Sequence, residues 1–407
     1  HNVTHKTLGQ LVAALVVGAS LLGAATVVRS HDRSRTPVQP RLSDAQVREL
    51  DIEFFQARVE RDSLGARDIG ELARLYLQRA RVTGDNDDLI RAEDYARRSL
   101  ALRAGRNQAS FLVLASTLLA QHRFVEAREV AARLVAYDST LIAARALLGE
   151  ALLELGEYEE ARKAFGKLLT YRTQLGVAPR LARWEELRGR PEEARRLLRA
   201  ARDQAERRHG MPTEQLAWFH LRLGDLALRH GHLGEAESEL EAGLAMVPED
   251  YRLLGAKARL EVVRRRWRKA IEYGERAIAQ SLDPATLGLL DDAYTALGDT
   301  AKAQEYYRAM ALAVLKQPGP FHRAWSLFLL DHDREVPVVL AKVEEEIQTR
   351  RDVYGYDLLA WALHKSGRHA EARAAMAQAL RLGTRDPMLF HHAGMIERAL
   401  GTETAAR

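Results

Sequence analysis

Residues 147–169 read LLGEALLELGEYEEARKAFGKLL, and this stretch decides the fold. Large apolar residues recur at three- and four-residue steps on both sides of Gly156, which is the spacing of one face of a helix. Gly156 lies where the first periodic segment ends, and a glycine there is typical of a helix end followed by a tight turn. The stretch is therefore predicted to be a helical hairpin.

Small residues equivalent to Ala161 recur along the chain at steps of 33 to 35 residues, with one step of 42. We call them the ruler positions, and they are Ala92, Ala127, Ala161, Ala194, Ala236, Ala270, Ala303, Pro337 and Ala372. In five units a glycine lies five residues earlier, at Gly156, Gly189, Gly231, Gly298 and Gly367. Because the arrangement returns at an almost constant interval, the hairpin is predicted to be a repeating unit.

The pattern resembles the tetratricopeptide repeat, a 34-residue helical hairpin with a Leu-Gly pair, an aromatic residue, Ala, Phe and Pro in order. Residues 142–175 match best, with Leu148-Gly149, Tyr158, Ala161 and Phe165, and residues 217–250 add Leu223-Gly224, Ala236 and Pro248. The resemblance covers about residues 66–401. It implies an all-α fold, an α-solenoid of about eight helical hairpins forming a right-handed superhelix with terminal capping helices.

The mixture of small and large residues has a physical reason in such a fold. Paired helices approach closely only where the contact residues are small, while large neighbours fill the space between one hairpin and the next. Each hairpin buries its apolar face by stacking on its neighbours, so the array is predicted to be one solenoid rather than a set of independent domains.

Several units depart from the pattern. The acidic stretch GDNDD at 84–88 is predicted to be a turn whose Asp caps the next helix rather than a calcium loop. The 42-residue step comes from RDQAERRHGMPTEQ at 202–215, and Pro337 is expected in the first turn of its helix. A capping box at Ser43 and Gln46 predicts the start of an N-terminal capping helix, and 388–400 are expected to form the C-terminal one.

The N-terminus carries eighteen uncharged residues from Leu11 to Val28, after Lys6 and before Arg29. That length favours a transmembrane anchor, while small residues near its end leave a cleaved signal peptide as the alternative. Basic residues after the segment outnumber those before it, which alone would keep the rest of the chain in the cytoplasm. A short basic head before an apolar run usually feeds export, so we expect a membrane-anchored or exported protein with an extracytoplasmic solenoid.

The predicted domain organisation follows from these segments. Residues 1–28 are an apolar anchor or signal segment, 29–41 a polar linker, 42–65 an N-terminal capping helix, 66–401 the solenoid with its C-terminal cap, and 402–407 a tail.

Composition excludes several classes of function. The 407 residues contain no cysteine, so disulfides, thiolate metal sites and cysteine nucleophiles are absent. Of 61 basic residues only 9 are Lys, and the basic side chains are interleaved with 56 acidic ones, so no nucleic-acid partner is expected. The basic cluster RRRWRK at 264–269 is expected to be a solvated turn in which Trp267 packs between repeats.

No catalytic signature is present: the chain lacks GxSxG, HExxH and a phosphate loop. The histidines do not have a known metal-ligand spacing, which holds both for His220, His230 and His232 and for His391 and His392. We therefore expect no enzyme activity, no catalytic residue, no cofactor and no metal.

The resemblance also implies a binding groove lined by the first helix of each hairpin. The groove residues it implies are Leu112, Glu150, Arg183, Trp218, Leu221, Asp225, Arg252, Arg259, Tyr354, Trp361, His364 and Lys365. Aromatic and Arg side chains are those most apt to dominate a protein interface. The chain has only three asparagines, Asn2, Asn86 and Asn107, which disfavours the carboxylate-clamp and asparagine-ladder functions of the family.

Two functions from different classes remain open. The first is a scaffold or adaptor, tethered to a membrane through the N-terminal segment or exported, that binds other proteins or peptides in the groove. The alternative is a structural protein that stacks end to end into a filament or other homo-oligomer, because a solenoid has two different ends that can complement each other.

The register of the repeat is testable at Ala161. We predict that Ala161→Arg lowers the helical melting temperature, because it forces a charge into a tight helix contact. An unchanged melt by circular dichroism would refute the register.

Overall fold

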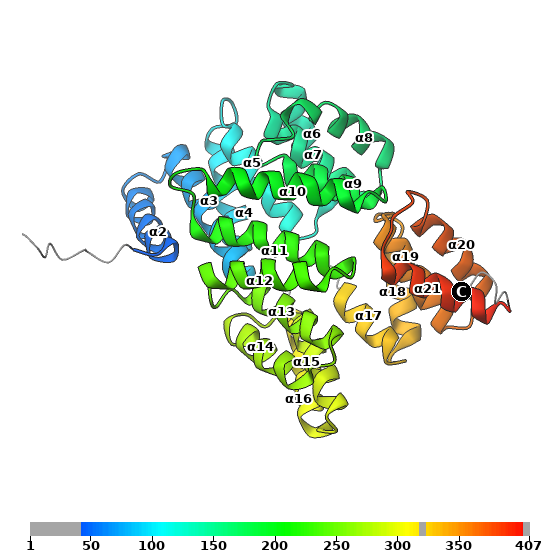
Figure 1. Ribbon diagram of the computed structural model, residues 1–407. Helices are drawn as coiled ribbons and strands as arrows, with labels where there is room; N and C mark the ends of the chain where they lie inside the picture. The colour runs from blue at the N-terminus through cyan, green and yellow to red at the C-terminus, as the bar shows by residue number, and fades with distance from the viewer. Residues whose placement is uncertain (1–41, 317–322, 402–407) are drawn as a thin grey trace, which may run out of the picture. The chain divides into compact units, whose positions relative to one another are not determined.

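The computed structural model describes residues 42–316 and 323–401 (Figure 1). These residues form 20 α-helices and one short 3-10 helix, Leu169–Tyr171, and they contain no β-strand. The predicted all-α class is confirmed. The apolar segment 1–28, the linker 29–41 and the tail 402–407 lie outside the described residues.

Among the residues that the structure describes, no helix combines the length and the apolar character needed to cross a membrane. The uncharged stretch Leu11–Val28 is not one of those residues, so its role as an anchor or a signal stays a prediction.

Eighteen of the helices form nine consecutive pairs. The pairs are α3 (Ala66–Thr83) with α4 (Asn86–Leu102), α5 (Gln108–Ala120) with α6 (Phe124–Tyr137), α7 (Ile142–Leu155) with α8 (Tyr158–Gly166), α9 (Ala178–Leu187) with α10 (Pro191–Glu206), α11 (Thr213–Arg229) with α12 (Leu233–Met246), α13 (Tyr251–Val263) with α14 (Trp267–Gln280), α15 (Pro284–Ala296) with α16 (Thr300–Lys316), α17 (Arg323–Asp331) with α18 (Val336–Glu346), and α19 (Val353–Lys365) with α20 (His369–Ala379). The sequence predicted about eight hairpins, whereas these residues form nine, because eight steps separate nine ruler positions.

One further helix packs at each end of the series. The first is α2 (Asp44–Arg61), which lies against α3, and the last is α21 (Pro387–Ala399), which lies against α19 and α20. Helix α2 begins directly after Ser43, at the position where the capping-box pattern predicted a helix start.

Small residues hold the two helices of a pair together. Every ruler alanine is at most 4% exposed. A Cβ added to Gly149 on α7 would lie 2.8 Å from the Phe165 ring on α8, and one added to Gly224 on α11 would lie 2.8 Å from Leu240 on α12. In these two pairs the second helix therefore places a large side chain directly on the backbone of the first, as the alternation of small and large residues predicted.

A residue in the left-handed backbone conformation follows the first helix in most pairs. Gly156, Gly189, Gly231, Gly298 and Gly367 have φ between 75° and 82°. His122 and Arg265 occupy the same place in their units with φ of 59° and 56°, although a Cβ makes this conformation costly. The turn conformation is therefore kept even where the glycine is missing.

The first helices of successive pairs also contact one another. Contacts run from α3 through α5 and α7 to α9, and again from α11 through α13, α15, α17 and α19 to α21. Between the two runs lie the long helix α10 and the connection 207–212, which produce the 42-residue step. Within each run, the first helices of successive pairs are therefore neighbours in space.

Glycine turns bring together pairs that are far apart in the sequence. A Cβ on Gly156 would lie 2.2 Å from the carbonyl oxygen of Arg351, and one on Gly189 would lie 2.1 Å from that of Gly383. The Tyr158 hydroxyl accepts a hydrogen bond of 2.7 Å from the backbone N–H of Val353. The third and fourth pairs are therefore in direct contact with the last pair and the loop that follows it.

Two local predictions are confirmed. The Asp85 side chain caps α4 by accepting a hydrogen bond of 2.9 Å from the backbone N–H of Asp87. Pro337 is the second residue of α18, where a helix needs no hydrogen bond from its backbone nitrogen.

Substituting Gly231 and Gly189 with alanine tests two contributions to stability: the cost of a left-handed conformation for a residue with a Cβ, and the cost of a steric clash. Gly231→Ala places a Cβ in open space at φ 77°, so we expect a loss of about 1–2 kcal/mol of unfolding free energy. Gly189→Ala adds the clash with Gly383, and we expect a further loss of about 1–3 kcal/mol by urea unfolding. Equal losses for the two variants would mean that the contact between the fourth pair and the 383 loop is not made in solution.

Candidate functional site

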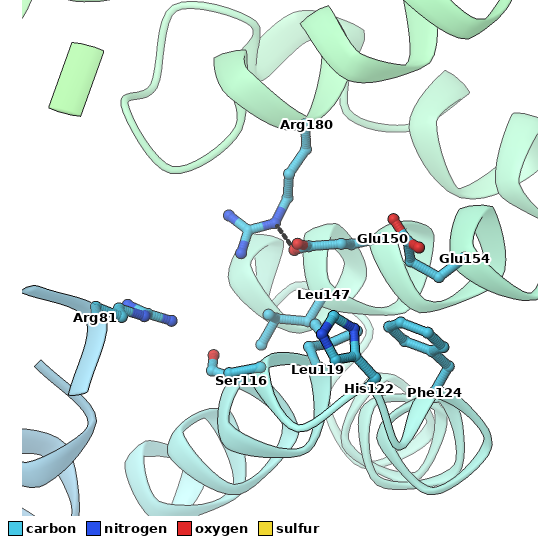
Figure 2. Close-up of a pocket in the computed structure, with 10 residues that line it drawn as sticks. Arg81, Ser116, Leu119, His122, Phe124, Leu147, Glu150, Glu154 and Arg180 are labelled. Atoms are coloured by element: carbon cyan, nitrogen blue, oxygen red, sulfur yellow. Dashed lines mark hydrogen bonds and ion pairs between the residues drawn. The ribbon is translucent and has the colours of Figure 1, made fainter. Parts of the chain in front are cut away.

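A cavity of about 310 Å³ opens on the first helices of the N-terminal half (Figure 2). Its wall includes Ser116 and Leu119 from α5, Leu147 from α7, the turn residue His122 and Phe124, the first residue of α6. Charged side chains complete it: Arg81 from α3, Glu150 and Glu154 from α7, and Arg180 from α9. The first helices of four successive pairs thus meet at one concave place.

The charges of this cavity are only partly balanced. Arg180 donates to the Glu150 carboxylate over 2.6 Å, and Arg350 pairs with Glu154 over 3.0 Å. The Arg81 side chain forms no hydrogen bond or ion pair with any residue that the structure describes. Although Arg81 reaches solvent, desolvation by the surrounding protein and then the charge of Arg180 lower the pKa of its guanidinium group.

A second group of charges lies on α9 and α11. Glu186 accepts from Arg183 over 2.9 Å and from Arg229 over 2.8 Å. Burial opposes its ionisation, yet His230 and these two guanidinium groups hold the pKa of Glu186 below its ordinary value. Arg222 on α11 forms no hydrogen bond or ion pair through its side chain with any described residue. Burial, followed by the charge of Arg229, lowers the pKa of Arg222.

The two groups form one charged surface, because Arg183 interacts electrostatically with both Glu154 and Glu186. We call this surface the inner wall. It consists of Arg81, Glu150, Glu154, Arg180, Arg183, Glu186, Arg222 and Arg229.

Six of the residues predicted to line the groove form contacts with one another or with the inner wall. Asp225 and Arg259 form an ion pair of 2.6 Å between α11 and α13. The Arg183 guanidinium lies 5.1 Å from the centre of the Tyr354 ring, so α9 meets α19 across a long interval of sequence. Arg252 pairs with Asp250 and donates to the main-chain oxygen of Arg81, and Glu150 lies in the cavity wall.

The apolar and indole residues of the predicted groove lie mostly in packing positions. Leu221 is 6% exposed and Trp361 is 4% exposed, so neither presents its side chain to a ligand, contrary to expectation. Trp361 is covered because α21 follows the last pair and stacks His392 on the indole at 4.2 Å. Leu112 and Trp218 are partly buried against neighbouring core residues.

The last two residues predicted to line the groove, His364 and Lys365, lie beside Trp361. His364 stacks on its ring at 5.0 Å, and burial followed by the charges of His369 and Lys365 lowers the pKa of His364. Lys365 forms an ion pair of 2.9 Å with Asp333. This end of the predicted groove is therefore a packed aromatic cluster rather than an open surface.

The sequence interpretation did not single out Arg81, Glu154, Arg180 and Arg222. Three of them lie three or four residues from residues it did name, since Glu154 follows Glu150, Arg180 precedes Arg183 and Arg222 follows Trp218. Residues at this spacing share a helix face, so extending each predicted position by one turn would have found them.

The other residues that the sequence analysis considered form structural contacts. His220 contacts Glu239 over 2.8 Å in the core, and Arg264 of the basic cluster pairs with Glu237 over 2.8 Å. Trp267 packs against the α14 and α15 core, as predicted.

Comparisons with known proteins identify the repeat. A model described as anaphase-promoting complex, cyclosome, subunit 3 matches residues 85–168, and models described as tetratricopeptide repeat match 221–284 and 353–382. The search of curated proteins returned no match.

Three solved structures match the chain at low similarity. PilW, described as a widely conserved type IV pilus biogenesis factor, is 20% identical with a TM-score of 0.41 over 51% of this chain and 93% of its own. The pilF protein of Pseudomonas aeruginosa is 17% identical with a TM-score of 0.40 over 59% of this chain and 99% of its own. The APC/C Cut9-Hcn1 hetero-tetramer is 12% identical with a TM-score of 0.35 over 89% of each chain.

The matched models fall on the helical pairs found in the structure, and the buried ruler alanines follow the same register. The chain is a tetratricopeptide repeat protein.

Proposed function

We propose that the chain is a non-catalytic scaffold whose inner wall binds an acidic segment of a partner protein. Arrays of this kind offer extended surfaces to other proteins, which supports a role in protein interaction. The observation that carries the proposal is the pair of guanidinium groups, Arg81 and Arg222, that lack a carboxylate partner within the described residues while their neighbours Arg180, Arg183 and Arg229 are all paired.

Arg81 is exposed to solvent and Arg222 is half-buried, and neither guanidinium group has a carboxylate partner among the described residues. Desolvation by the surrounding protein lowers the pKa of both Arg81 and Arg222, which means that their surroundings disfavour the cation. A carboxylate brought by a partner would supply the missing charge and could form bidentate hydrogen bonds with each guanidinium. An acidic peptide fits this surface better than a basic or an apolar one.

The size and the lining of the cavity support the same proposal. A volume of about 310 Å³ accommodates one or a few side chains, and Ser116 and His122 add polar groups to its wall. Glu150 and Glu154, held by Arg180 and Arg350, keep the positive potential local to Arg81. A partner would therefore have to place its carboxylate at a defined point, which favours a specific interaction over general charge attraction.

The location of the scaffold is a further part of the proposal. The uncharged stretch Leu11–Val28 supports tethering to a membrane or export, with the repeats outside the cytoplasm.

One observation favours the second function, end-to-end stacking. Both terminal helices expose apolar side chains: Leu50 and Phe54 of α2 are 53% and 57% exposed, and Met388 and Phe390 of α21 are 45% and 53% exposed. Exposed apolar groups at the two ends of a repeat array could meet between copies.

The two functions differ in what the chain captures. We predict that mild cross-linking of the full-length protein in its native host recovers a different protein near one to one, and that Arg222→Glu lowers the recovery more than about tenfold through like-charge repulsion. Arg268→Glu is the matched control, because Arg268 is exposed on α14 and has no ion pair in the described chain. Mass spectrometry gives the stoichiometry.

Equal recovery with Arg222→Glu and Arg268→Glu would contradict binding at the inner wall. A ladder made only of the chain itself would instead support stacking. The helical melt of each variant serves as the folding control.

A further inference from the structure

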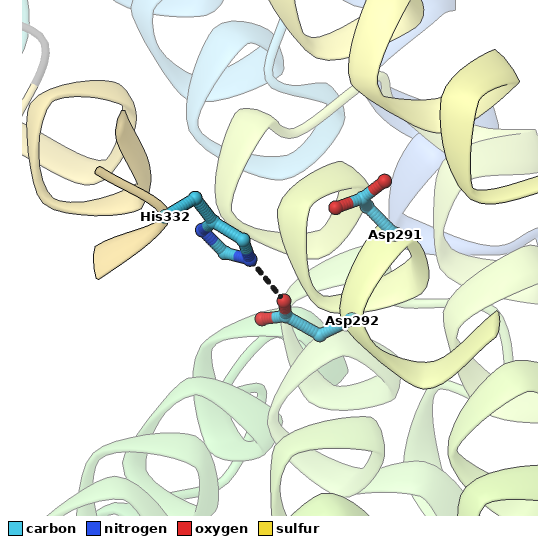
Figure 3. Close-up of side chains that lie close together, drawn as sticks. All are labelled: Asp291, Asp292 and His332. Carbon is cyan, nitrogen blue, oxygen red and sulfur yellow. Dashed lines mark hydrogen bonds and ion pairs between the residues drawn. The ribbon is translucent and has the colours of Figure 1, made fainter. Parts of the chain in front are cut away.

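We propose that Asp291, Asp292 and His332 form a binding site for a divalent transition-metal ion. The two aspartates lie on α15 and the histidine directly follows α17, so the site joins the first helices of the seventh and eighth pairs (Figure 3). One ligand atom from each residue lies within 4.8 Å of the other two. Figure 3 shows the three side chains directed into the same space between the helices.

The orientation of His332 is set from outside the group. Its Nδ1 lies 2.7 Å from the carbonyl oxygen of Phe328, and since a carbonyl can only accept, Nδ1 carries the proton. In the neutral ring the lone pair is then on Nε2, which faces Asp292. A histidine whose second nitrogen donates to a backbone carbonyl is the usual arrangement of a metal ligand.

The distance between His332 and Asp292 suits two ligands of one ion. Nε2 lies 2.8 Å from Oδ1 of Asp292. Two donor atoms that each lie about 2.1 Å from a metal, at right angles to each other, are about 3.0 Å apart. Without a cation or an added proton between them, two lone pairs would face each other at this distance.

Asp291 is the observation that distinguishes a metal from a proton. Asp291 as a whole is 4% exposed, and no group in the described ranges 42–316 and 323–401 donates a hydrogen bond to its carboxylate, whose oxygens are not among the fully buried unpaired atoms and so reach solvent. A proton on His332 would satisfy the contact with Asp292 but would leave the Asp291 carboxylate without a donor from the described residues. A confined carboxylate with no donor from the protein is less favourable than one bound to a cation, and a metal ion would be coordinated by all three groups.

The electrostatic surroundings agree with this assignment. Burial raises the pKa of Asp291, and the charge of Asp292 raises it further, while His332 and Arg334 lower it. Burial also raises the pKa of Asp292. A doubly charged cation beside the two carboxylates would offset the cost of ionising them.

The donor set indicates the class of ion. One imidazole nitrogen and two carboxylates suit Zn²⁺, Mn²⁺, Co²⁺ or Fe²⁺, whereas Ca²⁺ and Mg²⁺ take oxygen ligands. The ion would bridge α15 and α17, which belong to different pairs, so its effect is to hold two neighbouring repeats together.

The test uses the full-length chain without a polyhistidine tag, freed of metal by a chelator and titrated with Co²⁺ and Zn²⁺. We expect one equivalent of Co²⁺ to produce visible absorption bands, and Zn²⁺ to displace it and raise the melting temperature, because binding to the folded state stabilises it. Asp291→Asn and His332→Gln should each weaken binding more than about tenfold.

His391→Gln is the matched control, since His391 is an exposed histidine on α21 and should leave the affinity unchanged. The unliganded melt of each variant shows that it is folded. Absence of stoichiometric binding, or equal affinity for all variants including His332→Gln, would overturn the site and leave His332 and Asp292 as an ordinary ion pair.

Discussion

The close approach of a glycine or alanine on one helix to a large side chain on its partner is the constraint on which the structure depends. At Gly149 and Gly224 the neighbouring Phe165 and Leu240 occupy the place that a Cβ would take. This contact sets the distance within a pair. The same distance, repeated, lines up the first helices so that each touches the first helix of the next pair.

Glycine turns also allow close contact between repeats that are distant in the sequence. At Gly156 and Gly189 the turn lies against the backbone of Arg351 and Gly383, and only a residue without a side chain fits there in the left-handed conformation. These contacts bring α19 to α9, where Arg183 lies over Tyr354. Part of the surface available to a ligand is thereby occupied by the chain itself, and the inner wall around Arg81 and Arg222 is what we propose remains for a partner.

Local features of the fold could be predicted from the sequence because they depend on residues close together in the chain. The ruler alanines, the glycine turns, the cap at Asp85 and the place of Pro337 all belong to this class. Features that depend on distant repeats could not. The burial of Trp361 results from α21 packing over the last pair, and the approach of Asp291 to His332 depends on the angle between two repeats. The groove positions implied by the family resemblance placed Arg183 and Tyr354 on first helices, where the structure has them. The resemblance could not predict that these two side chains contact each other, because that contact joins distant repeats.

The central claim is that a partner binds on the first helices rather than on the second. Because the chain contains no cysteine, a photoreactive label can be attached at one chosen position. Ser116→Cys places it in the cavity wall on α5, and Ser238→Cys places it on an exposed site of the second helix α12. The account predicts that the captured partner is cross-linked from position 116 and not from position 238, and cross-linking from position 238 alone would contradict it.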